Sequence, residues 1–202
     1  MKEIVLASSN AGKLREFDAL FSDHGFTITP QSMHKVEDAI EDGLSFVENA
    51  LIKARHASRQ SGLPAIADDS GLEVDALKGE PGIYSARYSR DIVGDNANDK
   101  TNNQKLLEKM AAVPDERRTA RFVCALAVLR HENDPRPLIS IGAWEGVILR
   151  AERGENGFGY DPLFFVPDQQ CSSAELPPEL KNSISHRAQA LAQLLPQLEL
   201  LS

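Results

Sequence analysis

The sequence predicts an α/β or α+β chain with a mixed, twisted sheet and flanking helices. Three observations lead to this fold class. Short apolar runs, such as Ile4–Ala7 and Phe122–Leu129, are bounded by polar or glycine-containing segments and have the length of buried strands. Segments with a helical spacing of apolar residues lie between several of these runs. Strands and helices alternate irregularly, which favours a mixed sheet, and no internal repeat or interdomain linker divides the chain.

The length and charge of the chain limit its possible functions. With 202 residues, of which 42% are hydrophobic, we expect a single domain over 1–202, or one large lobe with a smaller one folded against it. The net charge of −8 and the pI near 5.2 argue against non-specific binding to a nucleic-acid backbone. They leave room for a nucleotide, whose phosphates need only a local positive pocket.

The lack of a recognisable targeting segment and the small number of cysteines indicate the compartment. No apolar stretch approaches the length of a membrane span, and the apolar run after Lys2 and Glu3 is too short for a signal peptide. Cys124 and Cys171 are too few and too far apart for a disulfide framework or a zinc site, and Cys124 lies in an apolar run as a buried thiol would. We therefore expect a cytoplasmic protein with no membrane partner.

The N-terminal strand leads through the polar loop Ser8-Ser9-Asn10 into a helix. The apolar face of this helix carries Leu14, Phe17, Leu20 and Phe21. Asn10 is a good N-cap, which places Ala11, Gly12 and Lys13 in the first turn. A helix N-terminus after such a loop is an anion site, where Gly12 lets a phosphate approach and Lys13 adds a charge. The pattern is not a Walker A loop, and a plain cap with a surface lysine is the alternative.

An acidic loop and a capped helix precede the central motif. A strand is possible at 26–28, and the acid-rich segment 37–43 is typical of a solvated loop, although one of its acids could reach a metal. Ser45 and Glu48 form a capping box, so Glu48 has a structural role. The helix that they open should run to about Gln60. Lys53, on this helix, is expected to be no more than a solubilising charge.

The stretch 65–71 is the one around which the predicted site is organised. Its apolar residues are typical of a buried strand end, and Gly71 permits a sharp turn there. Asp68 and Asp69 point in opposite directions if the strand continues. Two neighbouring carboxylates repel unless a positive group lies near them, and Mg²⁺ is the usual cation that such oxygen ligands attract. The alternative is a solvated Asp-Asp-Ser-Gly turn.

Further strands and helices follow this motif. Residues 72–77 alternate as a half-exposed strand, 99–110 have helical spacing, and the run 122–129 should be a central strand buried on both faces. Segments 138–141 and 144–148 continue the sheet as a hairpin. The glycine- and proline-containing loop 78–90 carries Arg87 and Arg90, each of which could meet phosphate or pair with a nearby acid.

Two polar clusters lie near the C-terminus. The glycine-rich loop 154–162 carries Phe158 and Tyr160, which could stack on a planar ring or enter the core, and an Asp161 held extended before proline. Segment 176–202 is expected to be helical. A concentrated donor patch lies at its beginning or at a break near Ser185 and consists of Lys181, Ser183, Ser185, His186 and Arg187.

Taken together, these stretches resemble the inosine triphosphate pyrophosphatase family, the dITP/XTP pyrophosphatases that remove aberrant purine nucleotides. The resemblance covers nearly the whole chain, in the family's order. It rests on segments 8–13, 46–50, 67–71, 81–87, 157–161 and 185–187. It implies a two-lobed α/β fold around a nucleotide cleft, a homodimer, and hydrolysis of a nucleoside triphosphate to the monophosphate and pyrophosphate with Mg²⁺.

The resemblance also assigns roles to residues. Asp69 would act as the general base or hold Mg²⁺, with Glu41 on the other side of the metal; whether Asp68 takes part is left open. The phosphate chain would be held by Ser8, Ser9, Asn10, Ala11, Gly12 and Lys13. The rest of the nucleotide would be surrounded by Ser70, Phe158, Gly159, Tyr160, Asp161, Lys181, His186 and Arg187. Ile40 and Leu180 depart from the family, because both positions are often acidic.

Donor chemistry explains the expected preference for aberrant bases. Arg187 can only donate hydrogen bonds and His186 can be set to donate, which matches the 6-keto acceptor of hypoxanthine or xanthine and not the amino group of adenine. Two other functions remain open. A Maf-type pyrophosphatase would prefer dTTP or UTP, although that family usually carries paired arginines in place of Gly12 and Lys13. A non-catalytic module would bind the nucleotide without turnover.

Overall fold

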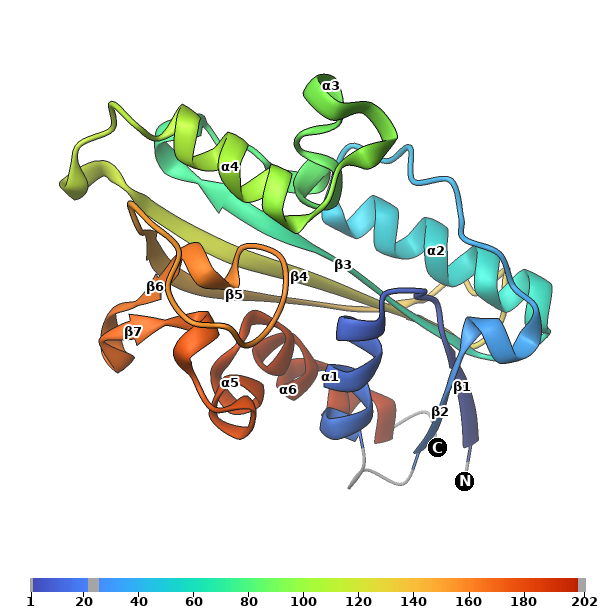
Figure 1. The fold of residues 1–202 in the computed structure, drawn as a ribbon. Helices are drawn as coiled ribbons and strands as arrows, with labels where there is room; N and C mark the ends of the chain where they lie inside the picture. The colour runs from blue at the N-terminus through green and yellow to red at the C-terminus, as the bar shows by residue number, and fades with distance from the viewer. Residues whose placement is uncertain (1, 22–25, 200–202) are drawn as a thin grey trace. The chain divides into compact units, whose positions relative to one another are not determined.

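The structure, a computed structural model, describes residues 2–21 and 26–199, and these form a mixed α/β fold (Figure 1). Its strands make one sheet in the order β2-β1-β3-β4-β5-β6-β7. β1 pairs in parallel with β2 and β3, whereas β5 with β6 and β6 with β7 are antiparallel. The predicted fold class, a mixed sheet with flanking helices, is confirmed.

The chain forms two compact units, each assembled from separated segments. The first comprises the residues up to Asp69, 124–142 and those from His186 onward; the second comprises 70–123 and 143–185. The boundaries fall within three strands, β3 (Ala65–Val74), β4 (Thr119–Leu129) and β5 (Leu138–Ile148), which therefore contribute residues to both units. No helix in the described ranges combines the length and apolar character needed to cross a bilayer.

The first unit is organised around parallel strands. β1 (Lys2–Leu6) pairs along its length with β2 (Phe26–Pro30), and Val5 lies opposite Ala65 of β3. The helices of this unit are α1 (Ala11–Phe21), α2 (Phe46–Ser61) and α6 (His186–Glu199). Their apolar faces and the strands enclose a core that includes Phe17, Phe21, Ile66, Leu126 and Leu194.

The second unit has its own core. It contains α3 (Arg90–Val93), α4 (Asp99–Lys109) and α5 (Pro178–Ile184), with the short strands β6 (Phe164–Val166) and β7 (Cys171–Ser172). Three aromatic rings meet at its centre: Phe164 lies 4.5 Å from Phe122 and 5.3 Å from Trp144, measured between ring centroids. Offset ring pairs at these separations are favourable.

Local signals placed most element boundaries correctly. Ser45 caps α2 by accepting from the Glu48 N–H, and the Glu48 carboxylate accepts in return from the Ser45 hydroxyl and the Leu44 N–H. α2 ends where Gly62 adopts φ +72° and donates its N–H to the Ser58 carbonyl. The predicted helix at 99–110, the central strand at 122–129 and the break at Ser185 are also found. Cys124 is a buried free thiol, as predicted.

Three predictions about strands are corrected. No turn occurs at Gly71, because β3 runs unbroken through it as far as Val74. The strand expected at 72–77 ends at Val74 and is followed by a 3₁₀ turn. Residues 138–148 form one continuous strand, not two segments of a hairpin. The expected inward Leu20 side chain, segment 22–25 and the end of the C-terminal helix at 200–202 lie outside the described residues.

Candidate functional site

The N-terminus of α1 carries the predicted cap. The Asn10 side-chain oxygen accepts the backbone N–H groups of Gly12 at 2.8 Å and Lys13 at 3.1 Å, so Asn10 is the N-cap. Ser8 accepts the Asn10 N–H, and Ser9 donates to Asp38 of the acidic loop. These bonds order the loop ahead of a helix whose N-terminal dipole is positive. Phosphate binding at this helix start stays a prediction.

Strand β3 presents its two adjacent acids to different partners. Asp68 is 1% exposed and faces Lys13, Arg187 and Cys124, whereas Asp69 is 6% exposed and faces α2. Successive side chains of a strand point to opposite faces, as predicted for this pair. The two carboxylates therefore have different ion-pair and hydrogen-bond partners, which we describe in turn as the Asp68 and Asp69 networks.

The Asp68 network is a buried cluster of charges. Its carboxylate pairs with the Lys13 ammonium and with Arg187 Nε at 2.9 Å, and it accepts from the Cys124 thiol at 3.2 Å. Arg187 also pairs with Glu16 of α1. Burial acts to raise the pKa of Asp68, but Arg187 and Lys13 outweigh it and hold that pKa well below its usual value. With two cations already bound, Asp68 is poorly placed to complete a metal site.

The Asp69 network joins three elements. Lys53 of α2 places its Nζ 3.0 Å from Asp69 Oδ1 and 3.3 Å from Glu41 Oε1, and Asn49 Nδ2 donates to Asp69 Oδ2 at 3.3 Å. Lys53 was expected to be only a solubilising charge, which is wrong, because its ammonium bridges the two acids. Asn49 and Lys53 were the residues missed. Their spacing of four along a predicted helix, which places them on one face, was the available signal.

Burial tunes the protonation of Asp69. It raises the pKa of this carboxyl above its ordinary value, and the nearby Lys53 and Lys13 ammonium groups offset that rise only in part. Burial lowers the pKa of Lys53, but the nearby Asp69 and Glu41 carboxylates raise it by more, so the net effect is a raised pKa. A carboxylate with a raised pKa accepts a proton more readily than an exposed aspartate, which suits a general base.

The residues around Lys53 have the donor chemistry for a hard cation. Glu41 and Asp69 both direct carboxylate oxygens at the Lys53 ammonium, and Mg²⁺ binds oxygens of this kind. No group of three or more His, Cys, Asp or Glu side chains within the described ranges is arranged to hold a metal ion. A cation at Glu41 and Asp69 would therefore take its remaining ligands from water or substrate, as Mg²⁺ commonly does.

In the second unit, Asp161 organises the glycine-rich loop. Its Oδ2 accepts from the Phe158 N–H at 2.8 Å and from Lys181 Nζ at 2.7 Å, and its Oδ1 accepts from Ser173 at 2.8 Å. Lys181 Nζ lies 5.3 Å from the centre of the half-buried Phe158 ring. Asp161 thus brings Phe158 and Lys181 together by accepting a hydrogen bond from each.

Several residues from the sequence-based site prediction lie in the interior. Tyr160 belongs to the second core, donates its hydroxyl to the Ser85 carbonyl at 2.8 Å and has a pKa raised by burial, so Phe158 is the better candidate for stacking. Arg187 is 1% exposed, and a base contact would require its pair with Asp68 to open. His186 is buried and Ser70 is half-buried. Arg90 pairs with Asp95, as the simpler alternative for that residue proposed.

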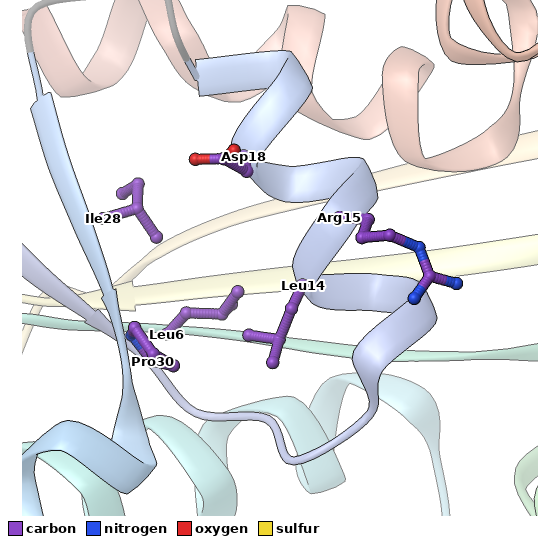
Figure 2. Close-up of a pocket in the computed structure, with 6 residues that line it drawn as sticks. All are labelled: Leu6, Leu14, Arg15, Asp18, Ile28 and Pro30. Carbon is purple, nitrogen blue, oxygen red and sulfur yellow. The ribbon is translucent and has the colours of Figure 1, made fainter.

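A separate pocket lies beside α1. It has a volume of about 270 Å³, and Figure 2 shows its lining side chains on α1, β1 and β2. The lining residues are Leu6, Leu14, Arg15, Asp18, Ile28 and Pro30. This set contains none of the predicted site residues, so the pocket is distinct from the charge networks on β3.

The described features define a mixed α/β protein with a capped helix N-terminus and, on one strand, two adjacent carboxylates that pair with lysines. The chain belongs to the Ham1 family, whose model matches residues 4–197.

Relatives and solved structures agree with this assignment. The dITP/XTP pyrophosphatase of Vibrio parahaemolyticus is 58% identical over 198 residues, which cover 98% of this chain and 97% of that protein. The dITP/XTP pyrophosphatase of Escherichia coli O157:H7 is 56% identical, with 98% of each chain covered. A HAM1 protein from Coxiella burnetii matches with 53% identity and a TM-score of 0.89, covering 98% of this chain and 99% of its own.

Proposed function

We propose that this chain hydrolyses non-standard purine nucleoside triphosphates (dITP, ITP, XTP and dXTP) to the monophosphate and pyrophosphate, and so cleanses the nucleotide pool. The observation that carries the proposal is the 58% identity, over nearly the full length of both chains, with a protein named dITP/XTP pyrophosphatase. The contacts around Asp69 supply a chemical basis for the reaction.

Asp69 is the proposed general base. Its oxygens face Lys53 and Asn49, which fix the carboxylate, and its raised pKa favours removal of a proton from water. The water oxygen forms a bond to the α-phosphorus, and the bond from that phosphorus to the α–β bridging oxygen breaks and releases pyrophosphate. Lys13 and the N-terminus of α1 stabilise the negative charge on the phosphate oxygens. Mg²⁺ held by Glu41 and Asp69 would neutralise part of the same charge.

Phe158, Lys181 and His186 are the proposed contacts of the purine and its sugar. A buried site whose donors face a 6-keto oxygen leaves those donors unpaired when adenine is present, and such mismatches discriminate strongly. We also propose a cytoplasmic homodimer, as implied by the family resemblance. Light scattering on the purified protein tests that oligomeric state, and the mass of a single 22.2 kDa chain would refute it.

Product analysis tests the proposed reaction. The wild-type protein should release pyrophosphate and the monophosphate from dITP and XTP in the presence of Mg²⁺, and EDTA should abolish this release. The panel includes ATP, dGTP, dTTP and UTP. Release of orthophosphate alone would refute the proposal, and higher activity on dTTP or UTP than on dITP would favour a Maf-type enzyme.

The variant Asp69→Asn separates binding from catalysis. The amide keeps the shape and most of the contacts of Asp69 but cannot accept the proton from water. We expect dITP to bind with little change and turnover to fall by at least a hundredfold, the usual range for loss of general base catalysis, about 10²–10⁴. Binding without turnover by the wild type would instead support the non-catalytic alternative.

A further inference from the structure

One peptide unit of the glycine-rich loop is held on both sides by helix α4. The Gly159 N–H donates to Asp99 Oδ2 at 2.7 Å, and the Gly159 carbonyl accepts from Asn103 Nδ2 at 3.1 Å. Asp99 is the first residue of α4, and Asn103 follows one turn later on the same face. All three residues lie in the second unit. We refer to Asp99 and Asn103 as the α4 clamp.

The clamp acts on a loop whose glycines have backbone angles that other residues rarely adopt. Gly157 and Gly159 adopt φ of +79° and +62°, a region that glycine enters without steric cost. At Gly157 a Cβ atom would lie 2.0 Å from Asp161 Oδ2, so that position excludes a side chain. Between these glycines, Phe158 donates its N–H to Asp161. The backbone on both sides of Phe158 is therefore fixed by side chains.

The buried side chain of Asn103 lowers the stability of the fold, so stability alone does not explain this residue. It is 3% exposed, and its Oδ1 has no hydrogen-bond partner within the part of the chain that the structure describes. A buried acceptor without a partner is unfavourable, so an apolar side chain would remove that penalty. What the amide provides is the bond from Nδ2 to Gly159.

We propose that Asp99 and Asn103 are positioning residues for base recognition, which hold the loop so that Phe158 is presented to the purine in one orientation. This inference rests on the proposed function and deepens it. Without the clamp the Gly159 peptide unit loses its two bonds to α4, so substrate binding must fix its orientation, and that cost appears in the affinity for the nucleotide. Asp69 and Lys13 lie on other elements, so the chemical step should be almost unaffected.

Asn102 provides a matched control on the same helix. It is 2% exposed and also bonds to backbone, accepting from the Ser89 N–H at 2.8 Å and donating to the Ala86 carbonyl at 3.2 Å. These contacts are to the segment before α4, not to the glycine-rich loop. Asn102→Ala therefore removes comparable hydrogen bonds from α4 without releasing Gly159.

The experiment measures kcat and KM for pyrophosphate release from dITP in Asp99→Ala, Asn103→Ala and Asn102→Ala, with the inhibition constant of inorganic tripolyphosphate, which has no base. Each clamp variant should raise KM about tenfold, the value of one or two hydrogen bonds. kcat and the tripolyphosphate constant should change less than about twofold. Asp99→Asn keeps an acceptor oxygen and should restore KM, whereas Asn102→Ala should lower thermal stability and leave KM unchanged.

Several results would overturn the inference. They are an unchanged KM in both clamp variants, an equal rise in the tripolyphosphate constant, or a failure of Asp99→Asn to restore KM. If Asn103→Ala does not fold, the exposed Asp99 still decides the question. A wild type that binds dITP without turnover would refute the proposed function, and dissociation constants for dITP would then judge the clamp. A wild type that does not bind dITP would refute both.

Discussion

Replacing Asp68 by asparagine should destabilise the protein strongly, although its neighbour on β3 tolerates the same change. Asp68 neutralises Arg187, which is 1% exposed, and Lys13, which is also largely buried. Removing one partner of a buried ion pair costs about 3–5 kcal/mol, because the remaining charge cannot return to water. Glu16 still pairs with Arg187, so we expect the lower end, about 3 kcal/mol.

This free energy corresponds to a large shift in melting temperature. For chains of this size, 1 kcal/mol changes Tm by about 2–4 °C, so Asp68→Asn should lower Tm by about 6–12 °C. Asp69→Asn is the control. Burial raises the pKa of Asp69, so its ionised form opposes folding at neutral pH, and Lys53 keeps Glu41 as a partner in the variant. The Tm of Asp69→Asn should stay equal to that of the wild type or rise.

Equilibrium urea unfolding and thermal unfolding followed by circular dichroism measure both variants. The pKa of Asp68 is lowered on folding, so its contribution is complete above the unfolded value near 3.8 and is lost as pH falls through the lower folded value. The difference between wild type and Asp68→Asn should therefore be constant from pH 8 to about pH 5. An Asp68→Asn protein as stable as Asp69→Asn, or a difference that shrinks between pH 8 and pH 6, would refute the reasoning.

Three further changes test other contacts. Lys53→Met removes the cation that lowers the pKa of Asp69, so the acidic limb of the pH profile of kcat/KM should move to higher pH; an unmoved limb would show that Asp69 is not the titrating base. Asn10→Ala removes the cap of α1 and should cost about 1 kcal/mol in urea unfolding while raising KM for dITP; Ser45→Ala, at the α2 cap, should cost stability only. Arg118→Met deletes a buried guanidinium that donates to the carbonyls of Met110, Val113, Ile148 and Leu149, and should cost about 3 kcal/mol or more; a loss below about 1 kcal/mol would contradict this account.

Predictions that depended on short-range chemistry agree with the structure. Asn10 and Ser45 cap their helices because a side-chain oxygen reaches N–H groups only two or three residues away, and this depends on local sequence. The prediction for Gly71 was wrong because glycine permits a turn without requiring one, and β3 continues through this residue to Val74.

The candidate site was predicted less completely than the fold. Asp69 and Glu41 were expected to hold a metal ion between them, which stays a prediction; in the structure the Lys53 ammonium pairs with both. The spacing of Asn49 and Lys53 places both on one face of α2, but only the structure shows that this face is turned toward Asp69 of β3. In the same way, the sequence does not distinguish Tyr160 from Phe158 as a stacking residue. The structure does, because Tyr160 is packed in the core of the second unit.

The sequence by itself determined most of the helices and strands, the helix caps, the family and the presence of two adjacent acids on one strand, since each follows from neighbouring residues. Only the tertiary structure decided which charges meet. Arg187 reaches Asp68 across 119 positions of the chain, and Lys53 reaches Asp69 across 16. The pKa of each acid depends on these distant partners and on burial, so the lowered pKa of Asp68 and the raised pKa of Asp69 arise only when the chain is folded.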